Sequence, residues 1–312
     1  VVNKLLALDK PVPFDFLVDG EFLRANVLQY IEAHKLSSEK VLRLEYVLAL
    51  SEPEQSTVDE TPEWISSVVA LQALPSQWFA SASYDGIVRV YQGAESRLSV
   101  RLADVGLAGV AALSVDGGRG SNLVAAGQDG LLRCCALRTD GKTAAVGPTT
   151  ILRGMERPQA LEAAAISEDG TLLAAAGWDQ DVWIWNSEPD LFAAPEAAGS
   201  GSKRKAVSSS EGKAPKFCLK GHTQVVTCLH FGEKARFPYT LLSSSWDCSV
   251  RVWDIAAASC VCNWAVARAV TSFSLNPCMP PQLATSHEDG HVSLWDVRAA
   301  PHLGVTGALL TA

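Results

Sequence analysis

Two histidines and a lysine-containing loop are the first places where this chain could do chemistry. Residues 139–143, TDGKT, end like a phosphate-binding loop, but the glycine needed five residues before Gly141 is Ala136. His287 and His291 have the i,i+4 spacing of zinc ligands on a helix, yet SHEDGHVSLW has the composition of a β-turn. The motifs GxSxG and HExxH are absent as well. The sequence therefore predicts neither nucleotide hydrolysis nor zinc catalysis.

The eight cysteines do not form a metal-binding pattern either. There is no CxxC pair, and neither Cys134-Cys135 nor Cys260-x-Cys262 has the spacing of a zinc site. Several cysteines lie in apolar, strand-like runs, such as Cys228 in VVTCLHF. We therefore expect reduced, buried thiols in a protein that works inside the cell and has no metal of its own.

Composition excludes some classes of partner. A net charge of −8 argues against wrapping nucleic acid with the whole surface, because neutralising phosphates requires a dense face of lysine and arginine. No apolar run approaches the roughly 18 residues that a membrane span needs. With 48% apolar and 19% charged residues, the chain is expected to be mostly folded.

A repeated turn organises most of the chain. Five segments, from SASYDGIVRVY to TSHEDGHVSLW, place small residues before a turn aspartate and an alternating apolar strand after it. Alternation with period two around such a turn predicts a β-hairpin. The spacings of the aspartates are 44, 50, 68 and 42 residues, close to one four-stranded propeller blade per repeat with one insertion. The five aspartates are Asp85, Asp129, Asp179, Asp247 and Asp289.

These repeats resemble the WD-repeat family. Trp253-Asp254 and Trp295-Asp296 close two of them, and Gly221-His222 opens the fourth. The resemblance implies an all-β WD-repeat β-propeller, with five blades visible of an expected seven and hence an incomplete ring. It also implies a buried tetrad in the fourth blade, formed by His222, Ser243, Asp247 and Trp253. A network of this kind is structural, because it satisfies buried polar groups.

The other repeats depart from this pattern. The fifth keeps Thr285, Asp289 and Trp295 but has Val266 where the histidine should align, and the second has Cys135 at the tryptophan position. Such departures should weaken single blades without changing the fold, because packing between sheets holds each blade.

Residues 1–50 are of a different kind. A helical spacing in VVNKLLAL is followed by two short strand patterns, a short amphipathic stretch and the strand VLRLEYVL. This order resembles the second half of a partial α+β ubiquitin-like β-grasp domain, without its opening hairpin. The acidic stretch 51–63 is expected to be a linker, and 64–312 the partial propeller.

The pairing of these two domains resembles the WD-repeat subunit of the PeBoW complex of large-subunit ribosome biogenesis. The segments that carry the resemblance are PVPFDFLVDGEFLR, LSSE and EWISSV; the sibling Notchless family shares the domain order and is the near alternative. The resemblance implies a non-enzymatic assembly factor for the 60S subunit and pre-rRNA processing, in the nucleolus and nucleoplasm. The implied partners are a Bop-type WD-repeat protein, Pescadillo, the pre-60S particle and the AAA-type ATPase midasin, with no membrane and no small-molecule substrate.

One glutamate gains a role from this resemblance. Glu39, in the predicted turn LSSEK, is by itself an ordinary solvated charge. In both families the matching glutamate inserts into a metal-ion-dependent adhesion site on midasin. A hard cation such as Mg²⁺, held by the partner, would accept such a carboxylate. No cofactor is expected apart from Mg²⁺ at this shared interface.

The insertion 187–217 is rich in glycine, serine, alanine, proline and lysine, and is expected to be disordered. Lys203, Arg204 and Lys205 form a basic patch that could serve nuclear import or RNA contact; a solvated loop without such a role is an equal alternative.

Two other functions remain open from sequence. A propeller enzyme would place several polar side chains around its channel, and a ubiquitin-ligase substrate receptor would need an adaptor-binding segment. Neither feature can be identified in this sequence.

Overall fold

The structure is a computed structural model of the 312-residue chain. It describes residues 13–18, 21–23, 26–35, 43–49, 61–71, 78–93, 95–115, 120–139, 144–154, 158–192, 214–232, 239–276, 282–296 and 309–310. The chain divides into two compact units, residues 1–58 and 59–312.

In its described residues, the first unit contains a three-stranded sheet in the order β2-β1-β3 and the helix α2. β1 (Phe14–Val18) pairs antiparallel with both β2 (Glu21–Phe22) and β3 (Leu44–Leu48). The amide oxygen of Asn26 accepts a 2.8 Å hydrogen bond from Gln29 N–H and so caps α2 (Val27–Ala33). This strand, strand, helix, strand order is the expected partial β-grasp arrangement. The helix expected in residues 1–8 lies outside the described residues.

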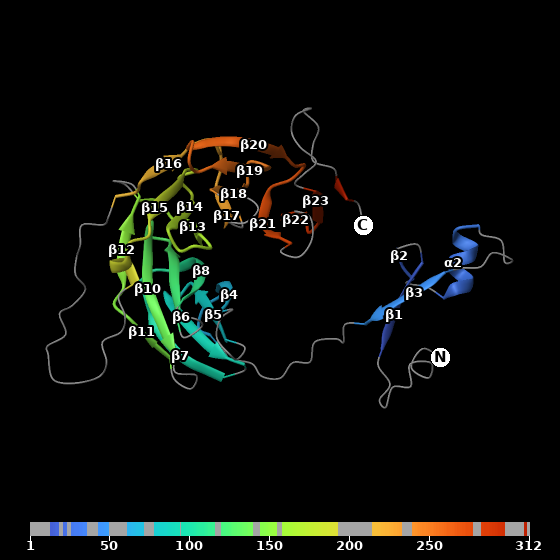
Figure 1. Cartoon of the computed structure of the whole chain (residues 1–312), viewed down its shortest axis with the longest axis horizontal. Coiled ribbons are helices and arrows are strands. Elements are labelled where there is room, and N and C mark those ends of the chain that lie inside the picture. Colours follow the sequence, from blue (N-terminus) through green and yellow to red (C-terminus); the bar gives the residue numbers. More distant parts are fainter. Residues whose placement is uncertain are drawn as a thin grey trace. The chain divides into compact units, whose positions relative to one another are not determined.

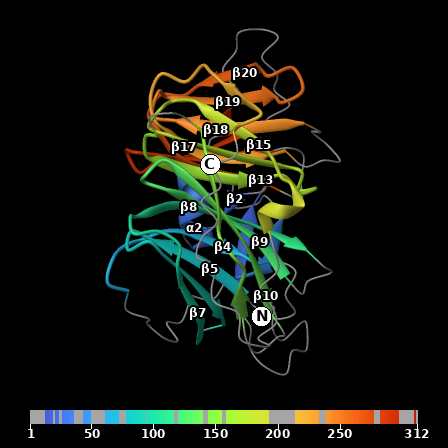
Figure 2. The same ribbon diagram turned by 90° about the vertical axis from the view of Figure 1, so that its left-hand side faces the viewer.

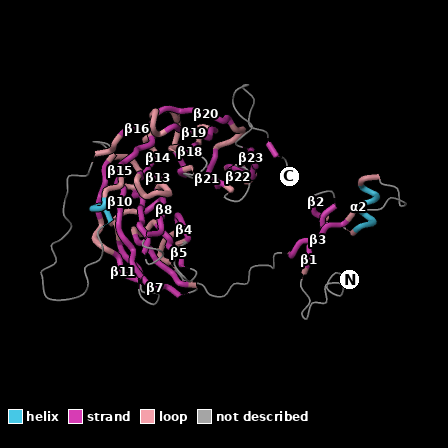
Figure 3. Tube along the Cα trace, viewed as in Figure 1, coloured by secondary structure: helices cyan, strands magenta, loops and turns pink. Residues whose placement is uncertain are grey.

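The described part of the second unit contains five consecutive antiparallel sheets, and the prediction of five visible propeller blades is confirmed. Figure 3 shows that strands make up most of the regular secondary structure in the described part of this unit. The first two blades consist of β4 (Ile65–Ala70), β5 (Trp78–Ser83), β6 (Ile87–Gln92) and β7 (Glu95–Arg101), then β8 (Leu107–Val115), β9 (Gly120–Gly127), β10 (Leu131–Thr139), β11 (Ala144–Val146) and β12 (Thr150–Arg153).

Each of the other three blades has four strands among the residues that the structure describes. They consist of β13 (Leu161–Ile166), β14 (Leu172–Gly177), β15 (Val182–Asn186) and β16 (Phe217–Leu219), then β17 (Val226–Phe231), β18 (Thr240–Ser245), β19 (Ser249–Asp254) and β20 (Ser259–Ala265), then β21 (Val270–Leu275), β22 (Gln282–His287), β23 (Val292–Asp296) and β24 (Leu309–Leu310).

The blades follow one another along an arc that is open between the first and the fifth (Figure 1). The first strand of each blade lies on the concave side and contacts the first strand of the next: β4 with β8, β8 with β13, β13 with β17, and β17 with β21. Figure 2 shows the same sheets stacked on one another. Apolar side chains fill the space between neighbouring blades; for example, Leu132 of β10 and Leu173 of β14 belong to one buried cluster. Packing between sheets therefore holds the arc together.

Each first strand begins with the same irregularity. After its first residue, the first strand of each blade shifts register against the second strand, so one extra residue of the first strand forms a β-bulge. The bulge residues are Ser66, Ala108, Glu162, Thr227 and Thr271.

Two bulge hydroxyls reach the next blade. Ser66 Oγ donates a 2.5 Å hydrogen bond to Leu107 O, and Thr227 Oγ1 donates one of 2.8 Å to Val270 O. Each acceptor is the first residue of the following blade's innermost strand. The bulge therefore joins neighbouring blades as well as bending the strand.

The insertion 187–217, which is expected to be disordered, contains regular structure at both of its described ends. Its described start contains the 3₁₀ helix η2 (Pro189–Phe192), in which Leu191 is fully buried and Phe192 nearly so. Its described end enters β16, where Phe217 pairs with Ile184. Two large apolar side chains next to a blade are buried because exposing them to water is costly. Residues 193–213 lie outside the described residues.

The helices in the described part of the chain are all too short and too polar to cross a bilayer.

Candidate functional site

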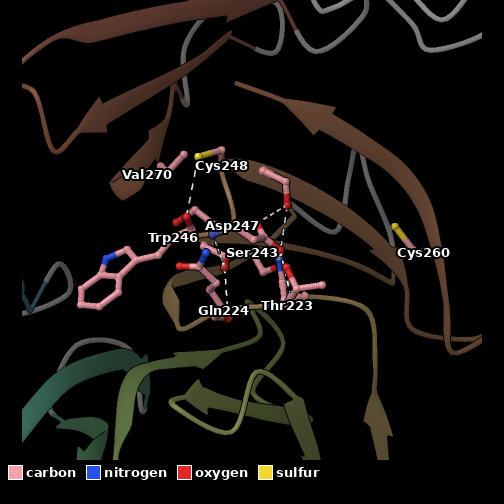
Figure 4. Close-up of polar contacts among 12 residues, drawn as sticks. Thr223, Gln224, Ser243, Trp246, Asp247, Cys248, Cys260 and Val270 are labelled. Atoms are coloured by element: carbon pink, nitrogen blue, oxygen red, sulfur yellow. Dashed lines mark hydrogen bonds and ion pairs between the residues drawn. The ribbon is translucent and has the colours of Figure 1, made fainter. Parts of the chain in front are cut away.

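In blade four, the structure brings the four predicted tetrad residues together. Trp253 Nε1–H donates to Ser243 Oγ at 2.8 Å, and Ser243 Oγ lies 2.6 Å from His222 Nε2. His222 Nδ1 lies 2.8 Å from Asp247 Oδ2. Each group can donate to the next, from indole through hydroxyl and imidazole to carboxylate, so every buried polar side-chain atom of the tetrad is satisfied. Figure 4 shows the contacts around Asp247.

The carboxylate of Asp247 has further partners. Ser249 Oγ donates to it at 2.6 Å and Thr223 N–H at 3.1 Å. Burial by itself would raise the pKa of Asp247, but these bonds and the bond with His222 hold it well below its usual range. A carboxylate committed to this many donors is a structural anchor rather than a catalytic acid or base.

Blade five completes part of the tetrad with a histidine from another position. Trp295 Nε1–H donates to Thr285 Oγ1 at 2.8 Å, and Thr285 Oγ1 lies 3.0 Å from His287 Nε2. His287 is buried and comes from β22 itself, two residues after the threonine. The WD-repeat pattern places this histidine at Val266, so the pattern does not point to His287.

In blades one and two an arginine takes the place of the histidine. Arg89 Nη2 lies 2.5 Å from Asp85 Oδ2, and Arg89 Nη1 donates to Ser83 Oγ at 2.7 Å. Arg133 Nη2 lies 2.5 Å from Asp129 Oδ2. In both blades the arginine is four residues after the turn aspartate, on the strand that follows the turn.

These arginines change the acidity of their partners. Burial alone would raise the pKa of Asp85, but hydrogen bonds from Arg89 and Ser83, together with the positive charge of Arg89, lower it to about 2. The pKa of Asp129 is likewise lowered, because Arg133 outweighs the effect of burial. Both carboxylates are therefore ionised and paired.

Blade three uses a third partner at the same position. Trp183, four residues after Asp179, donates its indole N–H to Asp179 Oδ2. Burial raises the pKa of Asp179; the bond from Trp183 opposes this, and the negative charge of Asp181 adds to the rise. A neutral donor thus leaves this aspartate less acidic than the aspartates of blades one and two.

The candidate metal ligands are not brought together. Among the described residues there is no group of three or more His, Cys, Asp or Glu side chains arranged to hold a metal ion. Cys134 and Cys135 are buried, and burial raises the pKa of both thiols, that of Cys135 to about 12. Cys260 Sγ contacts the backbone oxygen of Cys262.

The concave side of the arc forms a central cavity of about 660 Å³, lined by the innermost strands of all five blades. Most of its lining is small or apolar, from Ser66 of β4 to Ser272 of β21. Glu162 is the only carboxylate among the described lining residues. The other polar side chains among the described lining residues are serines, threonines, Cys228 and His230.

Glu39 and the basic patch Lys203, Arg204 and Lys205 lie outside the described residues. Their assigned roles stay predictions.

Comparisons with known proteins cover both units. Residues 1–31 match the NLE (NUC135) domain, and residues 149–186 and 213–254 match the WD domain, G-beta repeat. The second of these repeat matches runs from β16 of blade three to β19 of blade four and contains the complete tetrad. The chain is 31% identical to the "Ribosome biogenesis protein WDR12 homolog" of Chlamydomonas reinhardtii, over 96% of this chain and 69% of that protein.

The chain belongs to the WDR12/Ytm1 family. Fungal members named "Ribosome biogenesis protein ytm1" agree with this: that of Aspergillus niger is 30% identical over 96% of this chain and 65% of its own length, and that of Aspergillus clavatus is 31% identical over 96% and 66%. The chain therefore spans about two thirds of the length of these family members. Because these relatives are named as WDR12 and Ytm1 proteins, the resemblance to the PeBoW WD-repeat subunit is confirmed.

Proposed function

We propose that this chain is a non-enzymatic assembly factor for the 60S ribosomal subunit that acts in pre-rRNA processing. The observation that carries the proposal is the alignment with ribosome biogenesis proteins over 96% of the chain, which includes both the ubiquitin-like unit and the propeller.

A binding role also agrees with the state of the acidic side chains. Asp85, Asp129 and Asp247 are held in networks with low pKa values, and Asp179 bonds to an indole. A general acid or base needs a pKa near the working pH and access to a substrate. The turn aspartates are instead used to fix the blades.

The two units then have separate tasks. The propeller docks on a Bop-type WD-repeat protein and, through it, on Pescadillo. The ubiquitin-like unit is the handle for midasin, with the carboxylate of Glu39 completing the coordination of an Mg²⁺ ion held by midasin. Oxygen ligands are those that Mg²⁺ prefers, and such a site keeps a position open for a partner's carboxylate. Midasin can remove the complex by pulling only if the same chain is attached to midasin through one unit and to its complex partners through the other.

This work would take place in the nucleolus and nucleoplasm. Lys203, Arg204 and Lys205 would supply an import signal in the insertion, since a short basic cluster in a polar segment is the usual form of such a signal.

Affinity purification of the tagged chain from nuclear extract tests the proposal, with an unrelated WD-repeat propeller as control. We expect Bop-type and Pescadillo proteins and pre-60S factors to be enriched with this chain alone. Enrichment of adaptor and cullin subunits instead would indicate a ubiquitin-ligase substrate receptor. Enrichment of neither group would contradict the assembly-factor proposal.

A further inference from the structure

One position of each blade is fixed beside the start of its innermost strand, and these five positions are called the rim. The residue just before the turn aspartate donates its N–H to the carbonyl of the residue just before the innermost strand. This bond recurs in all five blades, with N···O distances of 2.9 to 3.2 Å. The residues placed in this way are Tyr84, Gln128, Trp178, Trp246 and Glu288.

Two of these rim residues meet across neighbouring blades. The rings of Trp178 and Trp246 form an edge-to-face pair with centroids 5.8 Å apart and an interplanar angle of 73°. Both remain exposed, by 47% and 41%, whereas Trp253 and Trp295 are buried in the blades. Figure 4 shows the Trp246 indole pointing away from the Asp247 network. The pair is therefore not needed for the structural network and presents aromatic surface to solvent.

A carboxylate lies beside this pair. Glu162 is the bulge residue of β13 and lines the cavity, and its Oε1 accepts a 2.7 Å hydrogen bond from Trp178 Nε1–H. A carboxylate can accept about four hydrogen bonds, so one indole leaves capacity for another donor. Within the described part of the chain, Glu162 forms no ion pair with a lysine or arginine. Burial, and secondly the charge of Glu162, raise the pKa of Tyr84, which places this negative charge near a third rim aromatic.

We propose that this part of the rim binds a lysine or arginine side chain of a partner protein, with the cation against Trp178 and Trp246 and paired with Glu162. The proposal goes beyond the assembly-factor role and does not depend on it.

The chemistry of the three side chains selects such an occupant. Indole faces attract cations through the ring quadrupole, most strongly when water is partly excluded. The carboxylate adds a charge-assisted hydrogen bond, which an apolar side chain could not use. RNA is disfavoured, because its phosphates would meet Glu162 on a chain with a net charge of −8.

The test uses the full chain, with the tryptophan indole N–H signals followed by NMR. Blocked arginine amide and blocked lysine amide are the cationic probes, blocked citrulline amide is the neutral isostere of arginine, and a short single-stranded RNA is the competing class. We expect both cations, and neither of the other probes, to shift the Trp178 and Trp246 signals. Comparison of the two cations shows which of them fits better.

Two variants identify the groups responsible. Glu162→Gln keeps the shape of the side chain and should weaken binding of the cationic probes at least about tenfold. Trp246→Ala should do the same. The matched controls are Glu95→Gln, an exposed glutamate of β7, and Tyr239→Ala, an exposed aromatic at the opposite end of β18 from Trp246. Both controls should bind like the wild type.

Three results would overturn the proposal: no shift with either cation, equal shifts with citrulline amide, or unchanged binding in Glu162→Gln. Shifts produced by RNA alone would assign the rim to nucleic acid instead. Loss of pre-60S factors in the purification experiment would leave these results untouched, so the two proposals fail independently.

Discussion

Arg89 and Asp85 form an ion pair across a tight turn, with 2.5 Å between Nη2 and Oδ2 and little exposure of either side chain. The pair does in blade one what His222 and Asp247 do in blade four: it gives a buried turn aspartate a donor that fixes the following strand. Removing one partner of a buried ion pair leaves the other charge uncompensated. This pair should therefore contribute more to the free energy of unfolding than ion pairs on the surface do.

Arg89→Gln should lower the free energy of unfolding by about 2 to 4 kcal/mol, because it leaves the carboxylate of Asp85 without its cation. Arg97→Gln is the control, since Arg97 pairs with Glu95 on the surface, where such pairs contribute about 0 to 1 kcal/mol. Urea unfolding measures both. Equal effects of the two substitutions would show that the buried pair has no special role.

Asp247→Ala should destabilise the propeller by about 2 to 4 kcal/mol, because it removes the acceptor of His222 and of Ser249. Asp104→Ala, at an exposed loop position, should change stability by less than about 0.5 kcal/mol. A loss below about 0.5 kcal/mol in Asp247→Ala would mean that the tetrad does not support blade four.

Stability should also fall in acid. Asp85 has a folded-state pKa of about 2, and the pKa values of Asp129 and Asp247 are lowered too, whereas an unfolded aspartate titrates near 4. Between about pH 4 and pH 2 the unfolded chain therefore binds more protons, so the free energy of unfolding decreases as the pH falls through that window. Asp179, with its raised pKa, acts in the opposite direction.

Chemical unfolding at a series of pH values between 2 and 5 measures this dependence. In Arg89→Gln the slope should be smaller, since Asp85 then titrates closer to its unfolded value. A wild-type stability that is constant across the window, or an unchanged slope in Arg89→Gln, would contradict the assignment.

The insertion 187–217 combines a polar composition with a buried leucine near its start, so changes to these two parts should differ in their effect on stability. Deleting residues 196–211 should change stability by less than about 1 kcal/mol, because loop closure entropy depends only weakly on length. Leu191→Ala should cost about 2 to 5 kcal/mol, because Leu191 is fully buried. Val261→Ala, at a 61% exposed position, is the control and should have little effect. If the deletion were as damaging as Leu191→Ala, residues 196–211 would have to make contacts that their composition does not predict.

Much of the fold could be predicted from the sequence, because the turn aspartates recur at blade spacing and each is followed by an alternating strand. The partners of those aspartates were harder to predict. Arg89, Arg133 and Trp183 all lie four residues after the aspartate, and that shared spacing was the available signal. The histidine tetrad of blade four does not indicate these residues, because different donors can satisfy the same buried carboxylate.

The rim pair was not foreseeable for another reason. Trp178 and Trp246 lie in successive repeats on either side of the insertion, and only the curvature of the arc decides whether their rings meet. Glu162 reaches Trp178 because a β-bulge gives β13 one extra residue, and bulges leave little trace in an alternating pattern. Leu191 and Phe192 were assigned to the disordered insertion because two apolar residues in a polar segment do not reveal where they pack.

The proposed function rests on two attachments that can be separated, and one binding measurement tests this most directly. Four proteins are compared: wild type, Glu39→Ala, Glu39→Asp and the control Glu45→Ala, which changes an exposed glutamate of β3 in the same unit. Binding of each protein to the adhesion domain of midasin is measured with Mg²⁺ and with EDTA. Binding of each protein to the Bop-type partner is measured as well. We expect wild type and Glu45→Ala to bind midasin only with Mg²⁺. Glu39→Ala should not bind it, and Glu39→Asp should bind poorly, because metal ligands tolerate displacements of only about 0.2 Å. All four proteins should bind the Bop-type partner equally. Midasin binding that persists in EDTA, or Glu39→Ala that binds as tightly as wild type, would contradict the account.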